Sequence, residues 1–434
     1  MKPLEILLLT DFDRRSASTI RDHINAFAAF SRHRFRRLSI YGDMPPRMDL
    51  SRFDGIVIHY TLIACMDNYL SRATRARLRA FSGLKAMFIQ DEYRFVNRTI
   101  AAMRDLGINL LFTCVPAPEI EKVYPAVALP GVTKRNVLTG FVPPSLLERA
   151  VAPPAARPLD IGYRGRRVPD YLGRLGREKW EIGERVAADA AKYGLVTDIS
   201  CREGDRIYGE AWIEFVASCK AMLGVESGAS VFDFTGDIER AVAEHLRQRP
   251  DTSFEELERL YLAEHEGKIR LNQISPRCFE AAALRTLMIL YEGEYSGILT
   301  PWRHYVPLRK DHANMAEVVA VLRDPARIAE ITERAYNEVA LDPRYSYAGA
   351  VAEVDGAIEA TVRPEMMSRK PPYSTFGFRW VAFVSLGMLL RRVRNLVLEV
   401  ARGPLLGLAQ HCLPAERVER FRDRLRRWRG IEAR

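Results

Sequence analysis

Short apolar runs alternate with amphipathic stretches along the first 145 residues. The runs are rich in Ile, Val, Leu and Phe, which is typical of strands buried on both faces of a parallel sheet. They fall at 5–10, 35–41, 55–60, 85–90, 110–114 and 137–142, with helical stretches at 18–31, 71–81, 98–106 and 118–123. Strand and helix alternating at this spacing predict a parallel α/β domain over residues 1–145.

A second α/β pattern follows a proline-rich stretch at 143–160. Proline fixes φ and lacks an amide donor, so we expect a linker over 146–158. The second domain is expected over 159–362, with a charged helical insertion at 237–268. Its strands are expected at 160–163, 195–200, 221–225 and 287–291, and its helices at 180–193, 208–217, 276–284, 315–322, 326–339 and 347–360. The pattern predicts two doubly wound, Rossmann-like domains and a separate extension over 363–434.

Composition places the chain among globular proteins. The 434 residues are 48% hydrophobic and 28% charged, which excludes disordered, collagen-like and disulfide-stapled classes. The six cysteines show no CxxC and no zinc spacing, so reduced thiols in a cytoplasmic protein are expected. The N-terminal apolar run is short and interrupted by Glu5, and it is interpreted as a first strand rather than a signal peptide.

The net charge of +10 belongs almost entirely to the extension. Residues 365–434 hold fifteen Lys and Arg against six Asp and Glu, whereas residues 1–364 hold fifty against forty-nine. The longest uncharged apolar runs there, 380–390 and 403–415, are too short to span a bilayer. We expect amphipathic helices lying on an anionic membrane surface, peripherally on its inner face. The alternatives are helices packed on the body with solvated arginines and, third, nucleic-acid binding, which the near-neutral body disfavours.

Several signatures of other enzyme classes are missing. The chain has no GxGxxG, GxxxxGK[ST], HExxH or GxSxG, and its first glycine is Gly42. This disfavours dinucleotide-dependent dehydrogenases, P-loop NTPases, zinc proteases and α/β-hydrolases. Asp11 and Asp13 form a DxD that could hold a metal ion. The alternative is a polar strand end followed by a helix cap.

The segment 275–293 (SPRCFEAAALRTLMILYEG) is the most informative. It places Arg277 and Glu280 at the start of a helix that precedes an apolar strand. Helix N-termini bind phosphate through free amides, and an arginine there adds a bidentate contact. The segment resembles the donor-site helix of GT-B glycosyltransferases, and most of all the R-x-FE-A-x-A pattern of the CgeB-like branch. Residues 301–314 resemble the same branch. The resemblance implies two Rossmann-like domains facing across a cleft, with Glu280 on the donor ribose and Arg277 on its diphosphate.

The chain departs from that family at the first of two glutamates. Many retaining members carry glutamates eight positions apart, but Asn272 stands eight positions before Glu280. Glu226, in the small-residue loop 223–230 with Gly228, is the alternative residue for facing the donor sugar or phosphates. It could instead be a loop carboxylate paired with an arginine.

Residues 162–179 open the second domain with glycines and cations. Gly165 allows close approach of a ligand to the backbone. In GT-B enzymes an arginine and a lysine here meet the diphosphate, which implies that role for Arg166 and Lys179, although they stand 13 positions apart. The alternative is an exposed basic loop.

Acceptor-side candidates follow strands of the first domain. Asp91 and Glu92 follow the fourth strand, and His59 ends the third, so all three fall at the edge of the sheet that faces a ligand crevice. A histidine at a strand end is also commonly structural. Trp180, Trp212 and Tyr208 are expected in the core.

We therefore expect a metal-independent enzyme, without a cofactor, that moves a sugar from a nucleotide-sugar to a hydroxyl of a glycan or lipid-linked acceptor. The glutamate pair favours retention of configuration by analogy. The alternatives are a nucleotide-sugar epimerase of the same fold and a non-catalytic sugar- or nucleotide-binding protein tethered to membranes.

Overall fold

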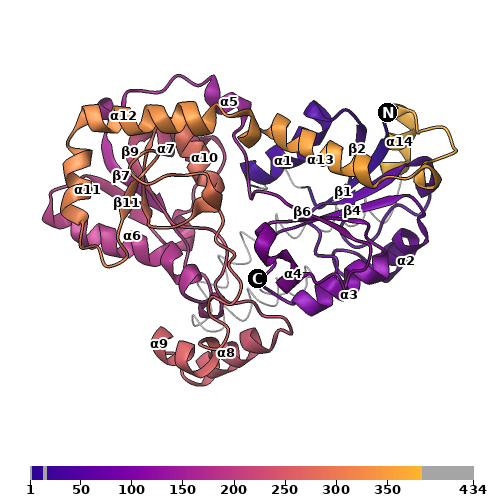
Figure 1. The fold of residues 1–434 in the computed structure, drawn as a ribbon, viewed down its shortest axis with the longest axis horizontal. Coiled ribbons are helices and arrows are strands. Elements are labelled where there is room, and N and C mark those ends of the chain that lie inside the picture. Colours follow the sequence, from indigo (N-terminus) through magenta and orange to yellow (C-terminus); the bar gives the residue numbers. More distant parts are fainter. Residues whose placement is uncertain (1, 13–16, 384–434) are drawn as a thin grey trace, which may run out of the picture.

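The computed structural model describes residues 2–12 and 17–383, which form two α/β lobes side by side (Figure 1). The first lobe has a six-stranded parallel sheet of order β2-β1-β3-β4-β5-β6. Its strands are β1 (Glu5–Thr10), β2 (Arg34–Ser39), β3 (Gly55–Ile58), β4 (Leu84–Ile89), β5 (Leu110–Thr113) and β6 (Thr133–Asn136), and its helices are α1 (Ser18–Phe30), α2 (Arg72–Ala80), α3 (Val96–Leu106) and α4 (Ile120–Val123). Leu7 and Leu9 enter one apolar cluster and Ile6 and Leu8 another, so both faces of the sheet are covered.

The second lobe has a five-stranded parallel sheet of order β11-β10-β9-β7-β8. Its strands are β7 (Leu159–Arg164), β8 (Thr197–Ser200), β9 (Cys219–Gly224), β10 (Leu287–Tyr291) and β11 (Val306–Leu308). Its helices are α6 (Arg174–Lys192), α7 (Glu210–Ser218), α8 (Asp237–Gln248), α9 (Phe254–Leu257), α10 (Pro276–Ala283), α11 (Met315–Leu322) and α12 (Pro325–Ala335), and α5 (Pro144–Leu147) precedes it. The expected fold class is confirmed: the protein is α/β, with two Rossmann-like domains.

The last strand of the first sheet lies earlier in the chain than the sequence predicts. The apolar run 137–142 was the expected strand, but β6 has the polar sequence TKRN. As an edge strand it has only one neighbour, β5, and so does not need apolar side chains. The apolar run packs between the lobes instead, where Phe141 contacts Tyr347 and the Val142 amide donates to the Tyr345 carbonyl.

Helix α13 (Tyr347–Thr361) crosses back from the second lobe and packs on the first (Figure 1). Tyr347, Val351 and Val354 are buried in the same cluster as β1 and β4. Its buried Asp355 accepts hydrogen bonds from the Ser31 hydroxyl (2.7 Å) and the Arg32 amide (2.8 Å), just after α1. The range expected for the second domain, 159–362, therefore includes a helix that packs with the first domain.

The segment 231–271, here called the clasp, joins the two lobes a second time. It contains α8 and α9, which lie below the second lobe in Figure 1. Its Phe232, Ile269 and Leu271 are buried in the apolar core of the first lobe. Arg94, which follows β4, forms a two-pronged ion pair with Glu239 of α8, and its Nε–Oε2 distance is 2.8 Å. The charged insertion expected on the surface is thus an interdomain contact.

After α13 the chain passes to the side of the first lobe that faces away from the second lobe. The last described element there is α14 (Thr375–Phe383). Phe378 is buried there, and the Tyr373 hydroxyl accepts from the Asp49 amide (2.8 Å). No helix within residues 2–12 and 17–383 is long and apolar enough to cross a bilayer. Most of the basic extension expected over 363–434 lies outside the described residues.

Candidate functional site

A cavity of about 430 Å³ lies between the two lobes at the carboxyl ends of their strands, the position in which open α/β sheets bind ligands. We call it the interdomain cavity. The second lobe supplies residues after β7 and β9, residues of β10, and the starts of α7 and α10. The first lobe supplies the start of α1 and the loop after β4. The charged residues among its lining are Asp91, Arg164, Arg166, Lys179, Arg206, Glu226, Arg277 and Glu280.

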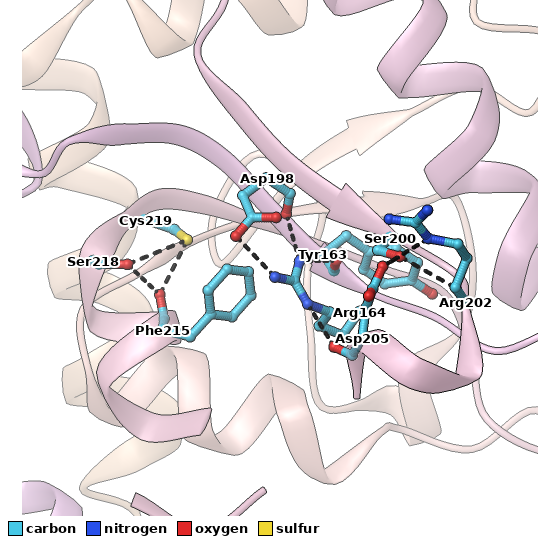
Figure 2. Close-up of polar contacts among 9 residues, drawn as sticks. All are labelled: Tyr163, Arg164, Asp198, Ser200, Arg202, Asp205, Phe215, Ser218 and Cys219. Carbon is cyan, nitrogen blue, oxygen red and sulfur yellow. Dashed lines mark hydrogen bonds and ion pairs between the residues drawn. The ribbon is translucent and has the colours of Figure 1, made fainter. Parts of the chain in front are cut away.

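Three arginines follow one another closely at the end of β7, but only one is left available. Arg164 is locked in place, because it forms an ion pair with Asp198 (2.8 Å), donates to the Asp205 carbonyl and lies over the Phe215 ring (Figure 2). Arg167 pairs with Glu184 (2.7 Å). Arg166 is exposed, lines the cavity and has no hydrogen-bond or ion-pair partner among residues 2–12 and 17–383.

Lys179 reaches the same place from α6. Its ammonium donates to the Gly228 carbonyl (2.6 Å), and the described part of the chain offers it no ion-pair partner. Burial lowers the pKa of Lys179 to about 8, the Asp91 carboxylate opposes that shift, and the Arg166 charge adds to it. The fold therefore brings Arg166 and Lys179 together despite their separation in sequence, and sets them opposite Asp91 of the other lobe.

Glu280 and Arg277 lie where helix α10 meets the cavity. Ser275 caps the helix, and its hydroxyl accepts from the Arg277 amide. Glu280 is buried and its Oε2 accepts from Trp212 Nε1 (2.8 Å), while burial raises the pKa of its carboxyl group. The Arg277 guanidinium lies 4.9 Å from the centre of the Trp212 ring and donates to the Arg164 carbonyl. Both residues line the cavity, as the sequence predicts.

Close packing also explains why Gly165 and Gly228 have no side chain. A Cβ atom on Gly165 would lie 2.8 Å from the Lys179 carbonyl oxygen, so this position sets how closely β7 approaches α6. Gly228 has φ of +114°, and a Cβ atom there would lie 1.8 Å from the Leu271 carbonyl oxygen. Only Gly165 lines the interdomain cavity, and Gly228 contributes by holding Lys179 through its carbonyl.

Glu226 lines the interdomain cavity, but its carboxylate is buried and bonded within the second lobe. Oε1 accepts from the amides of Glu294 (2.9 Å) and Tyr295 (2.8 Å), and Oε2 accepts from Asn272 Nδ2 (2.7 Å). Its role is to fix the loop after β10. Glu226 and Glu280 both line the cavity, and retention of configuration stays a prediction.

Of the three acceptor-side candidates, only Asp91 lines the cavity. It is exposed, with a left-handed φ of 56°, and accepts from the Tyr93 hydroxyl (3.1 Å). Glu92 instead points into the first lobe, where Thr113, the Cys114 amide and Tyr124 donate to its carboxylate. Burial raises the pKa of Glu92 to about 7 despite those bonds.

His59 is also turned away from the cavity. It is fully buried and its Nε2 lies 2.9 Å from Nδ1 of His23. Burial and the neighbouring His23 hold the pKa of His59 well below its usual value.

Two aromatic residues expected in the core contribute to the cavity. Trp212 is buried, but it lies beneath Arg277 and holds Glu280. Tyr208 is 54% exposed and lines the cavity near Arg206. The available signal was the glycine that follows Tyr208, because Gly209, with φ of +62°, is the cap residue just before helix α7.

No group of three or more acidic, histidine or cysteine side chains gathers within residues 2–12 and 17–383 in a way that could hold a metal ion. Asp13, the second residue of the DxD, lies outside the described residues.

The fold and cavity define a two-domain α/β protein with a cation-lined interdomain cavity. No family model and no curated protein matches the sequence. Similar solved structures include an alpha-glucosyltransferase in complex with UDP-glucose and DNA containing an abasic site (9% identity, 82% of this chain and 100% of that chain, TM-score 0.46) and Anabaena HepE in complex with UDP (9%, 82% and 100%, 0.45). A third is the DNA-modifying beta-glucosyltransferase studied with and without uridine diphosphoglucose (11%, 82% and 100%, 0.45).

These similar structures are nucleotide-sugar-dependent glycosyltransferases or are bound to UDP. None of the three is described as CgeB-like. Identities of 9–11% and TM-scores below 0.5 carry no conclusion about what this chain binds. Its function is therefore inferred from its own residues.

Proposed function

We propose that the protein is a glycosyltransferase that moves a sugar from a nucleotide-sugar to an acceptor hydroxyl in the interdomain cavity. One observation carries the proposal. Arg166 and Lys179 have no carboxylate partner among residues 2–12 and 17–383, and they lie at the carboxyl ends of the second sheet and face Asp91 across the cavity. When the bond between sugar and diphosphate breaks, the leaving diphosphate gains negative charge, and preorganised cations stabilise that charge.

The other residues fit distinct parts of such a reaction. Arg277 would add a further cation for the diphosphate, and the oxygen of Glu280 that Trp212 leaves free would accept from a ribose hydroxyl. Asp91 would accept the proton that the acceptor hydroxyl loses as it attacks the sugar. With Glu92 and His59 turned into the first lobe, Asp91 is the one acceptor-side candidate that remains in the cavity.

We also propose that no metal ion is required, because Arg166 and Lys179 supply the charge that a divalent cation would supply. Transfer measured after exhaustive treatment with EDTA should keep most of its rate. A rate that falls and returns on adding Mg²⁺ or Mn²⁺ would overturn this part of the proposal.

The test is a donor screen followed by turnover. UDP, GDP, ADP and CDP are compared by thermal shift, because a ligand that binds the native state raises the melting temperature with its concentration. One of them should bind, and Arg166→Ala should weaken that binding. Arg167→Ala is the matched control, because Arg167 is a neighbouring arginine that pairs with Glu184 and does not line the interdomain cavity.

Turnover separates the alternatives. Release of free nucleoside diphosphate that increases with an acceptor glycan or lipid-linked sugar supports a transferase. Conversion of one nucleotide-sugar into its epimer without release would show an epimerase. Binding without either reaction would show a non-catalytic binding protein.

We further propose that the protein works in the cytoplasm as a peripheral membrane protein on a lipid-linked acceptor, as in polysaccharide biosynthesis. On α14, Phe376 and Trp380 are 77% and 57% exposed, and their rings stack at 6.2 Å. An exposed aromatic pair next to cations fits a membrane interface. Vesicles with anionic lipid should sediment the full chain at low salt, and a Phe376→Ser, Trp380→Ser double variant should bind them less. No sedimentation of the full chain would overturn the membrane proposal without touching the donor site.

A further inference from the structure

A second cavity, of about 210 Å³, lies inside the first lobe between α1, α13 and the sheet. Most of its wall is apolar, with contributions from Phe27, Phe88, Val137, Phe141, Val351 and Val354. Arg344 and Glu353 supply charged groups to the same lining. A dry apolar cavity of roughly 150 Å³ in another protein accepts benzene, so this one has room for a somewhat larger molecule.

The His23 ring lines this cavity together with the polar side chains of Asn136, Tyr345 and Tyr347. The hydrogen bonds around His23 assign its protons. The Thr61 amide donates to His59 Nδ1 (3.2 Å), so Nδ1 of the neutral His59 carries no proton and Nε2–H does. His59 Nε2–H then donates to His23 Nδ1 (2.9 Å). His23 is itself neutral, since burial lowers its pKa to about 4, and its proton must therefore be on Nε2.

The Nε2–H group of His23 is thus a fixed donor. No acceptor for it occurs among residues 2–12 and 17–383. The ring is held on three sides by Phe27, Phe88 and His59, at centroid distances of 5.1–5.2 Å. The His23 side chain is half-buried, and a ligand oxygen placed beside Nε2 would give this donor a partner in place of water.

The location of this cavity also distinguishes it from the interdomain cavity. Its lining includes both segments that join the lobes, residues 136–141 on the outgoing path and residues 344–347 on the return. A small space of about 10 Å³ shares His23 with this cavity and Thr19 with the interdomain cavity. That space holds about one water molecule and is too narrow for a sugar. A ligand here would contact the interdomain crossing but not the donor site.

We propose that this cavity is a second binding site, for a small apolar molecule of about ten non-hydrogen atoms that carries one oxygen acceptor for His23 Nε2–H. Ketones, esters and ethers with a compact aromatic or alkyl body belong to this class. The site is independent of the proposed transferase reaction, and His59 acts in it as a positioning residue that fixes the tautomer of His23.

Acetophenone and cumene are the probes, because they have nearly the same shape but only acetophenone has an oxygen acceptor. Isothermal titration on the full chain should give acetophenone an affinity about three to ten times that of cumene, the ratio that one net hydrogen bond provides. The ¹⁵N shifts of His23 should report Nε2–H before binding, and the Nε2 proton should move on adding acetophenone but not cumene.

Two variants decide the outcome. His23→Phe keeps a ring but removes the donor, so it should bind the two probes equally. Val351→Trp should lower the affinity for both by filling the cavity, and nucleoside-diphosphate binding by each variant checks that the fold and the donor site are intact. Failure of both probes to bind the wild-type protein, equal binding of the two by the wild-type protein, or unchanged binding by Val351→Trp would overturn the proposal. None of these results bears on the donor site.

Discussion

Lys179 gives the proposed donor site a pH dependence that can be worked out in advance. Burial lowers its pKa from the usual 10.5 to about 8 in the empty cavity. Between these two values the unfolded chain holds more protons than the folded one, so the contribution of Lys179 to the free energy of unfolding rises with pH from about 8 to 10.5. A bound diphosphate would restore the charged form and raise the pKa again. Binding therefore requires the protonated lysine and should weaken over the same pH range.

The size of the effect follows from the two pKa values. If the diphosphate returns the pKa of Lys179 to its usual 10.5, the affinity should fall about tenfold between pH 7 and pH 9, or by about 1.4 kcal/mol. At pH 9 binding should take up close to one proton, because most of the free protein is then deprotonated at this position. At pH 7 the uptake should be close to zero.

Isothermal titration of the nucleoside diphosphate chosen by the donor screen measures both quantities. Titrations at pH 7, 8 and 9 in two buffers with different ionisation enthalpies give the affinity and the proton uptake. Lys179→Met should bind weakly and show no change in affinity over this range. Lys192→Met is the matched control, since Lys192 lies on the same helix and pairs with Asp189 at the surface. A fall in affinity with pH that persists in Lys179→Met, or no such fall in the wild-type protein, would refute this account of the site.

Three further predictions test other parts of the structure. Glu280→Gln should weaken nucleoside-diphosphate binding by about 1–3 kcal/mol in the titration described above, because it removes a charged acceptor. Unchanged affinity would contradict the proposed contact between Glu280 and the ribose. Asp91→Asn should lower turnover about 10²–10⁴-fold while donor affinity stays within about twofold, as expected of a general base, and an equal loss of both would argue against that role. Glu239→Ala should lower the free energy of unfolding in urea by about 1 kcal/mol, because it leaves Arg94 of the first lobe without its ion pair to the clasp. Glu244→Ala, which removes the partner of the exposed Arg247, should change that free energy little.

The sequence predicts most elements because buried parallel strands and amphipathic helices carry local signals. The expected strand at 287–291 and helix at 315–322 coincide with β10 and α11. The strand expected at 137–142 was wrong, because an apolar run signals burial but not what covers it. The sequence did not predict that the clasp contacts the first lobe, for a related reason. The charged helix α8 indicates a surface segment, whereas Phe232 and Leu271 on either side of it are buried in the first lobe.

Site residues were predictable where the chemistry is local to one helix end. Arg277 and Glu280 lie on the first turns of α10, and the sequence indicates both the helix start and the side of it that they share. The direction of the Glu226 side chain could not be predicted, because Asn272 and amides near residue 294 set it and no local pattern reveals them. The same holds for Glu92, because Tyr124 and Thr113 donate to its carboxylate inside the first lobe.

The arrangement of the interdomain cavity depends on contacts that hold the lobes together at two separated places. On one side are the crossing segments, where α13 leaves the second lobe and packs on the first. On the other side the clasp buries Phe232 and Leu271 in the first lobe and pairs Glu239 with Arg94, only three residues after Asp91. Two such attachments resist rotation of one lobe against the other better than a single hinge does. The clasp therefore fixes where Asp91 stands relative to Lys179, and the two halves of the proposed site are already assembled before a donor binds.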